Sequence, residues 1–114
     1  MSTRRYFQGS GAFNGATAVD IKDPGATGTA YVTKFTISIV THANAKFVGL
    51  QDSTGTPVVF CKHNDLTAAA GVPSVITYDF GKKGIPMTAA KKVQLISEGS
   101  GPAGYGYVEG YVIR

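Results

Sequence analysis

Hydrophobic and polar residues alternate along most of the chain, and this period of two residues is typical of half-buried β-strands. The clearest case is the segment 29–41, in which we expect one face to be apolar and the other polar. The apolar face is expected to hold Tyr31, Phe35, Ile37 and Ile39, and the polar face Lys34, Thr36 and Ser38. We therefore predict that one side of this strand packs on a core.

Several shorter segments combine apolar residues with turn residues at their ends, which also predicts strands. These segments are 17–21, 45–51, 57–61, 74–80, 91–97 and 103–113, with a short extended piece at 85–87. Turns are expected at 22–25 and 81–84, and a hairpin loop at 52–55 is expected to pair 45–51 with 57–61 in antiparallel orientation. Residues 63–73 are predicted to form a long surface loop. Seven or eight short strands without an ordinary helix predict an all-β protein, an antiparallel sandwich or barrel.

Composition supports a single β-rich domain. The 114 residues are 43% hydrophobic and 16% charged and include 15 Gly and 5 Pro, a balance that disfavours helix bundles and coiled coils. A chain of this length holds one core. Residues 1–15 join a basic and aromatic cluster at 4–7 to a glycine-rich stretch without strand periodicity. We therefore predict an extended N-terminal arm at 1–15 and a single β-sandwich domain at 16–114.

The basic residues and the N-terminus suggest two further partners, and neither is supported. The net charge of +4 raises nucleic acid as a partner, but the lysine pairs at 82–83 and 91–92 are not interleaved with aromatic residues. Residues 3–7 resemble a twin-arginine export signal, but the polar residues 8–15 replace the apolar stretch that such a signal needs. No run approaches the roughly 18 apolar residues of a membrane span. We expect neither nucleic acid nor membrane as a partner.

Three short motifs match known signatures by spelling but lack the required context. Residues 99–104 match a dinucleotide fingerprint, yet a strand is predicted after them in place of the helix that would hold the pyrophosphate. Residues 52–55 differ by one inserted residue from the loop of aspartic proteases, and 79–81 spell a kinase triplet in a chain too short for a kinase. Glu98 and Glu109 are the only glutamates, and nothing supports a carboxylate pair for glycoside hydrolysis.

Cys61 is the only cysteine, so no internal disulfide can form. Together with His42, His63 or Asp65 it could provide a thiol nucleophile or a metal site. However, Cys61 follows an apolar run, where a buried and inert thiol is usual, and the spacing differs from that of common zinc ligands. We expect no catalytic residue, no metal and no cofactor.

The last predicted strand alternates tyrosine with glycine. One face is expected to hold Tyr105, Tyr107 and Tyr111, and the other Gly104, Gly106 and Gly110. The bare glycine face suggests close approach by another backbone or by a bulky neighbour. Three interpretations of the tyrosine face stay open: core packing, a protein interface, or a platform on which carbohydrate stacks.

Four stretches of the chain resemble a known group of proteins. They read YVTKFTISI at 31–39, GLQDSTGTPVVF at 49–60, YDFGKKGIPM at 78–87 and YVEGYV at 107–112. Together they resemble small jelly-roll structural proteins of tailed bacteriophages, in which a strand ending in Leu-x-Asp-Gly-Thr, an Ile-Pro step and a closing Gly-Tyr strand recur. This chain departs from the pattern at 52–55, where one extra residue lengthens the turn.

The resemblance implies a jelly-roll-like sandwich and a role without catalysis. Proteins of this group act as capsid decoration or cement proteins, commonly trimers seated on the head, or as tail components. We therefore expect a virion protein of the capsid surface, assembled in the host cytoplasm, that binds across junctions of the major capsid protein and forms a homotrimer. The interface is expected to include Arg4, Arg5, Tyr6, Phe7, Tyr105, Tyr107 and Tyr111.

Two functions of other classes stay open at this point. The first is a carbohydrate-binding jelly roll on a tail or spike, which would use Tyr105, Tyr107 and neighbouring loops. The second is a small hydrolase that would use Cys61 or a carboxylate.

Overall fold

The computed structural model describes residues 4–14, 18–41, 47–54, 63–64, 74–97 and 103–114. These ranges contain β-strands and turns, and no helix within them is long and apolar enough to cross a membrane. The strands are β1 (Arg4–Asn14), β2 (Val19–Lys22), β3 (Thr29–Thr41), β4 (Phe47–Asp52), β5 (His63–Asn64), β6 (Ser74–Asp79), β7 (Ile85–Pro86), β8 (Val93–Ser97) and β9 (Ala103–Ile113).

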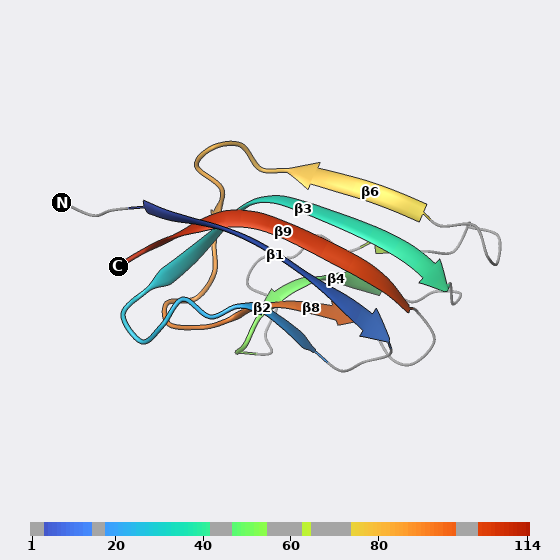
Figure 1. Cartoon of the computed structure of the whole chain (residues 1–114), viewed down its shortest axis with the longest axis horizontal. Helices are drawn as coiled ribbons and strands as arrows, with labels where there is room; N and C mark the ends of the chain where they lie inside the picture. The colour runs from blue at the N-terminus through green and yellow to red at the C-terminus, as the bar shows by residue number, and fades with distance from the viewer. Residues whose placement is uncertain (1–3, 15–17, 42–46, 55–62, 65–73, 98–102) are drawn as a thin grey trace.

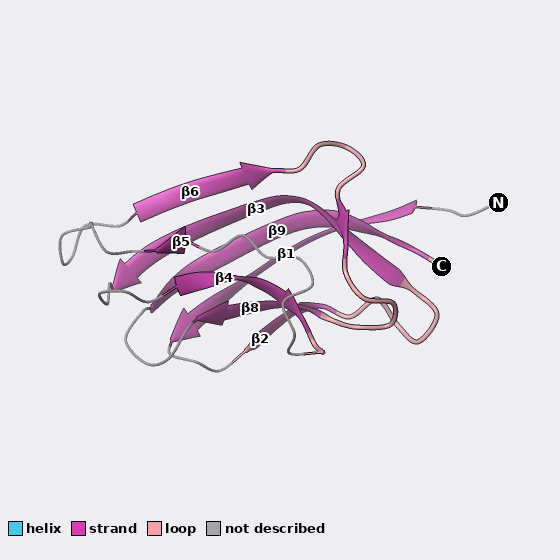
Figure 2. Ribbon diagram, turned by 180° about the vertical axis from the view of Figure 1, so that it is seen from behind, coloured by secondary structure: helices cyan, strands magenta, loops and turns pink. Residues whose placement is uncertain are grey.

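The strands form two sheets that pack face to face (Figures 1 and 2). The larger sheet has the order β1-β9-β3-β6, with β7 also paired to β3, and the smaller sheet has the order β2-β8-β4-β5. The pairs β1 with β9, β2 with β8, β3 with β6, and β4 with β5 are antiparallel and nested in one another along the chain. Two four-stranded sheets with this nesting form a jelly roll, and the two-residue strand β7 is an addition to it.

The predicted fold class is therefore confirmed, and two of the observed strands have the predicted bounds. Residues 29–41 and 103–113 are β3 and β9 as predicted, and the turn at 81–84 closes with a hydrogen bond from Gly84 N to Gly81 O at 3.1 Å. The predicted strand at 57–61 lies outside the described residues, as does most of the predicted loop at 63–73. The first two residues of that loop differ from the prediction, because they form β5 and pair with β4.

Residues 4–14 are a strand of the larger sheet, where we predicted an arm without regular structure. β1 pairs with β9 in an unbroken register from Arg4, opposite Ile113, to Asn14, opposite Ala103. Glycines conceal this strand in the sequence: the inner positions hold Phe7, Gly9, Gly11 and Phe13, so the apolar alternation is interrupted at its centre. The two glycines are needed because β2 lies against β1 there, and a Cβ at Gly9 would be 2.7 Å from the side chain of Ile21. The division of the chain into an arm at 1–15 and a domain at 16–114 stays a prediction.

One hydrophobic core lies between the two sheets. Its buried residues come from both sheets and from the segment after β7: Phe13, Ala30, Val32, Phe35, Ile37, Ile39, Leu50, Met87, Val93, Leu95, Val108 and Val112. Three of the four residues predicted for the apolar face of β3 are among them, which confirms that this face packs on a core.

Tyr31 is the exception, because the prediction that its side chain faces the core was wrong. The register of β3 against β9 shifts between Val32 and Lys34, which is the mark of a β-bulge. The inward and outward alternation changes phase at the bulge, so Val32 faces the core and Tyr31 faces away from it. The ring of Tyr31 stacks on that of Tyr111, with 5.0 Å between the ring centroids.

The glycines of β9 face the core side, and close neighbours occupy the space that side chains would fill. A Cβ at Gly104 would lie 2.0 Å from the carbonyl oxygen of Ser38, and a Cβ at Gly110 would lie 2.1 Å from that of Tyr31. A Cβ at Gly106 would lie 2.5 Å from the side chain of Leu95 in the other sheet. This finding confirms the predicted close approach of a backbone or a bulky neighbour.

Replacing Gly110 or Gly104 by alanine should lower the free energy of unfolding by about 1–3 kcal/mol, because the added methyl group meets backbone that cannot move without disturbing β3. Urea denaturation followed by circular dichroism measures this change. As a control, Ser10→Thr adds a methyl group to an exposed residue of β1 and should change stability by no more than about 0.5 kcal/mol. A Gly110→Ala protein as stable as the parent would contradict the close packing.

Candidate functional site

The outer face of the larger sheet is the surface that turns away from the smaller sheet. The register of the strands arranges its side chains in rows that cross β1, β9 and β3, and in most cases β6. We name four rows by one member each: the Tyr111 row (Tyr6, Tyr111, Tyr31), the Glu109 row (Gln8, Glu109, Lys34, Asp79), the Thr36 row (Ser10, Tyr107, Thr36, Thr77) and the Tyr105 row (Ala12, Tyr105, Ser38, Val75).

The Tyr111 row is an aromatic cluster next to a cation. Tyr111 stacks on Tyr31, and the ring of Tyr6 meets it edge-on at 6.0 Å. The guanidinium of Arg4 lies 4.4 Å from the centroid of the Tyr111 ring, which is a cation–π contact. The hydroxyl of Tyr111 donates a hydrogen bond to the carbonyl of Lys83. These neighbours leave Tyr111 only 1% exposed, whereas Tyr6 is 75% exposed.

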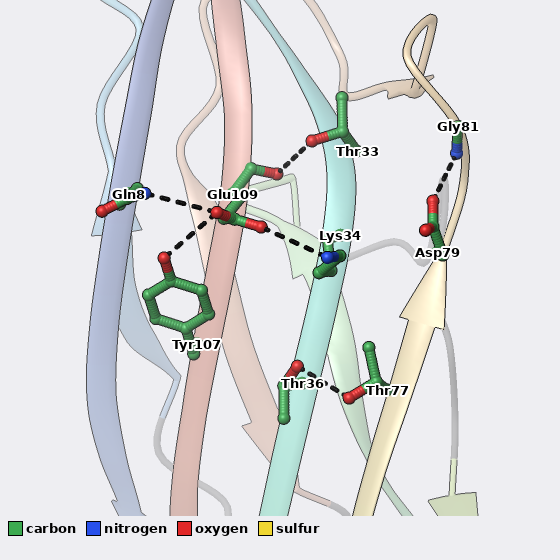
Figure 3. Close-up of polar contacts among 9 residues, drawn as sticks. All are labelled: Gln8, Thr33, Lys34, Thr36, Thr77, Asp79, Gly81, Tyr107 and Glu109. Carbon is green, nitrogen blue, oxygen red and sulfur yellow. Dashed lines mark hydrogen bonds and ion pairs between the residues drawn. The ribbon is translucent and has the colours of Figure 1, made fainter.

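The Glu109 row is held together by one carboxylate (Figure 3). Gln8 Nε2 and the Tyr107 hydroxyl, which comes from the next row, each donate to Glu109 Oε1 at 3.3 Å. Lys34 Nζ lies 3.9 Å from Glu109 Oε2 on the other side. Burial of the Tyr107 phenol, together with the negative charge of Glu109 and the hydrogen bond to it, raises the pKa of Tyr107.

The other two rows are polar near the Glu109 row and apolar farther away. In the Thr36 row the hydroxyls of Thr36 and Thr77 share a hydrogen bond of 3.0 Å (Figure 3). In the Tyr105 row Tyr105 is 61% exposed and Val75 is 63% exposed. On β1 the members of the two rows, Tyr6 and Ala12, are six positions apart, so the exposed tyrosines lie about 20 Å apart along the strands.

The outer face of the smaller sheet has a different character. Gln94 Nε2 donates to Asp20 Oδ1 at 2.7 Å, Lys92 Nζ donates to Asp20 Oδ2 at 3.2 Å, and Gln51 donates to Gln94. The hydrogen bonds from Gln94 and Lys92 lower the pKa of Asp20. In the described part of the chain, all large hydrophobic side chains that are exposed, Tyr6, Val40, Val75 and Tyr105, lie on strands of the larger sheet. The outer face of the larger sheet is therefore the candidate functional surface.

The structure brings together five of the seven residues predicted for an interface. Arg4, Tyr6, Tyr105, Tyr107 and Tyr111 all belong to the outer face of the larger sheet. Phe7 does not, because it is an inner residue of β1 whose ring lies against Gly110, 3.0 Å from where a Cβ would be.

Arg5 is exposed but stands at the inward-facing position of the same strand, next to Phe7. Sequence reasoning missed Tyr31, Lys34 and Glu109. The sequence did contain a signal for Glu109: it lies two residues from both Tyr107 and Tyr111, so its side chain is expected on the same face of the strand.

A pocket lies at the corner of the outer face where the Tyr111 and Glu109 rows meet the turn at 81–84. Besides Thr33 and Gly81, the side chains that line it are Arg4, Tyr6, Lys34, Asp79, Lys82 and Glu109. The lining thus combines three cations, two carboxylates and an exposed aromatic ring. We call it the corner pocket.

The residues considered for catalysis or metal binding do not form a described site. Cys61, His42, Asp65 and Glu98 lie outside the described residues, as does the side chain of His63. Within the ranges that the structure describes, no three His, Cys, Asp or Glu residues are grouped so as to hold a metal ion. The residues after the 99–104 motif form β9, so the helix of a dinucleotide site does not follow them.

The acidic residues of the two other motifs, Asp79 and Asp52, accept hydrogen bonds that stabilise the local backbone. Asp79 Oδ1 accepts a hydrogen bond from Gly81 N at 2.9 Å, which shapes the turn after β6. Asp52 is fully buried at the end of β4 and accepts from Thr54 N at 3.0 Å, from the Thr54 hydroxyl, and from Thr88 N at 2.9 Å. Burial alone would raise the pKa of Asp52, but the hydrogen bonds from Thr54 and Thr88 outweigh it and lower the pKa below its usual value.

Asp52→Asn should lower the free energy of unfolding by about 1–3 kcal/mol at pH 7. Both carboxylate oxygens of Asp52 accept hydrogen bonds from backbone N–H groups, and the amide of asparagine would place its own N–H group against one of these donors. The lowered pKa of Asp52 means that its contribution is present above the unfolded pKa of about 4 and is lost as the pH falls through the folded value. Urea denaturation between pH 7 and pH 2 should therefore show a smaller loss of stability on acidification for the variant than for the parent. Asp79→Asn, at an exposed turn that asparagine also favours, is the control and should change stability by less than about 0.5 kcal/mol.

Comparison with known proteins gives a likeness of fold. No family model and no curated protein matches the sequence. Among solved structures, a chain of the cyanophage Pam1 capsid asymmetric unit is similar with a TM-score of 0.56 and 13% identity, over 97% of this chain and 85% of that chain. A chain of the acid-stable capsid of Helicobacter pylori bacteriophage KHP30 is similar with a TM-score of 0.58 and 13% identity, over 97% of this chain and 93% of that chain.

Proposed function

We propose that this protein is a structural component of a bacteriophage virion, a decoration protein that binds across junctions of the major capsid protein and reinforces the head. It acts as a homotrimer on the capsid surface, assembles in the host cytoplasm, and catalyses no reaction. The single observation that carries the proposal is the outer face of the larger sheet, with Tyr6 and Tyr105 standing exposed at its two ends.

The outer face has the chemistry of a protein interface. Exposed tyrosines provide apolar area with a hydroxyl for hydrogen bonding, and they are enriched where proteins meet. The Glu109 and Thr36 rows between them already satisfy many of their polar groups within the sheet, so a partner can cover them at a low cost in desolvation. A sheet face with exposed apolar side chains at both ends and paired polar groups between them offers an extended contact surface to another protein.

The fold agrees with this proposal. Both similar structures named above come from bacteriophage capsids, and this chain spans most of the length of each. At 13% identity the likeness concerns the fold, and the role on the capsid is our inference from the outer face.

The position of β1 changes how the proposal is best tested. Deleting residues 2–14 removes an entire strand of the larger sheet and the core residue Phe13, so loss of binding would not separate a contact from a folding defect. Substitution of Tyr105 on the outer face avoids this problem because its side chain is exposed.

Tyr105→Ala should weaken binding to assembled heads of the virus that encodes this chain by about tenfold, equivalent to about 1.4 kcal/mol, because tyrosines are enriched among the residues that supply most of the binding energy of an interface. Cosedimentation of purified protein with heads measures the occupancy. Gln94→Ala, which removes a side chain from the outer face of the smaller sheet, is the matched control and should bind like the parent. Equal binding by Tyr105→Ala and the parent would contradict the proposed surface, and no binding by the parent would contradict the proposed function.

Two further measurements distinguish the finer parts of the proposal. Sedimentation equilibrium should give three times the chain mass of 11.9 kDa for a trimer. A glycan array should give no signal, whereas a sugar signal lost in Tyr105→Ala would favour a carbohydrate-binding module on a tail or spike.

A further inference from the structure

The corner pocket contains carboxylates that already have partners. Glu109 accepts from Gln8 and Tyr107 and lies 3.9 Å from Lys34. Asp79 accepts from Gly81 N through one of its oxygens. Each acid of the pocket therefore has at least one partner within the protein.

Two cations of the pocket are in a different situation. Among the described residues, no carboxylate oxygen lies within 4.0 Å of the side-chain nitrogens of Arg4 or Lys82. Arg4 is held in place by the ring of Tyr111, which offers attraction to the flat guanidinium but accepts none of its hydrogen bonds in the plane. The N–H groups of the Arg4 guanidinium are therefore available at the rim of the pocket as donors to a ligand.

We infer that the corner pocket binds the carboxylate of an aspartate or glutamate in a partner protein, with Arg4 donating the fork of hydrogen bonds and Lys82 adding positive charge. A guanidinium positioned by an aromatic ring matches the planar carboxylate. The exposed ring of Tyr6 lines the same pocket and packs against the methylene groups of the incoming side chain. The inference rests on the proposed function only for where the partner is found, on the capsid.

The charge balance of the pocket favours one carboxylate over a nucleic acid. Three cations, Arg4, Lys34 and Lys82, face two carboxylates, Asp79 and Glu109, so the excess is one positive charge. A single carboxylate neutralises it. A nucleic acid strand would bring a row of phosphates toward the two acids and be repelled by them.

Titration of the full chain with a blocked peptide of alternating threonine and glutamate, followed by nitrogen-15 NMR, tests the site without any capsid. Amide signals of Lys34, Gly81 and Lys82 should shift with the glutamate peptide and stay in place with the same peptide carrying glutamine. Arg4→Gln and Lys82→Gln should each weaken binding, the first by about tenfold or more, as expected for loss of hydrogen bonds to a charged group. Binding should also weaken as salt is added.

Controls separate loss of the site from loss of the fold. Lys91→Gln removes an exposed lysine elsewhere and should bind the glutamate peptide like the parent. Lys82 lies exposed in a turn, so its variant should keep the dispersed spectrum of the folded chain even if Arg4→Gln unfolds. Absence of shifts, equal shifts with the glutamine peptide, or tighter binding of a DNA oligonucleotide at these amides would each overturn the inference. Binding of the peptide by a chain that does not bind heads would retain this site and reject the proposed function.

Discussion

The architecture depends on three glycines, Gly104, Gly106 and Gly110, on the inner face of β9. At Gly104 and Gly110 the carbonyl oxygens of β3 occupy the place of a Cβ, and at Gly106 the side chain of Leu95 from the smaller sheet does so. Aromatic rings of β1 lie over two of these glycines and fill the remaining space, Phe13 over Gly104 and Phe7 over Gly110. Since β9 is the central partner of both β1 and β3, the packing at these three positions decides how closely the strands and sheets approach.

Strands with regular alternation could be predicted from sequence, and strands with interrupted alternation could not. β9 has the predicted bounds because it alternates over its whole length, and β3 has them because it alternates regularly on each side of its bulge. β1 was missed because Gly9 and Gly11 hold inner positions that only the neighbouring β2 explains. Tyr31 was placed on the wrong face because the bulge after Val32 depends on pairing with β9. The nested pairing of the jelly roll is likewise a property of partners distant in sequence.

The residues of the candidate surface likewise fall into those that the sequence could predict and those that depend on partners distant in the chain. Tyr105, Tyr107 and Tyr111 were identified because their spacing along one strand sets their common face. The contact of Arg4 with Tyr111 and the hydrogen bond from Gln8 to Glu109 each require residues that are about 100 positions apart to meet. Tyr111 also shows that facing outward is not the same as being accessible, because Arg4, Tyr6 and Tyr31 enclose it.

The antiparallel pairing of the first and last strands has a practical consequence for anyone who labels or displays this protein. Arg4 stands opposite Ile113, so the start of β1 and the end of β9 lie at one end of the molecule (Figure 1). That end is also the one that carries Arg4 and Tyr6. An affinity tag, a fluorophore or a displayed antigen joined at the start of β1 or at the end of β9 would therefore attach at the same end of the sheet, and exchanging one position for the other would not carry it away from Arg4 and Tyr6.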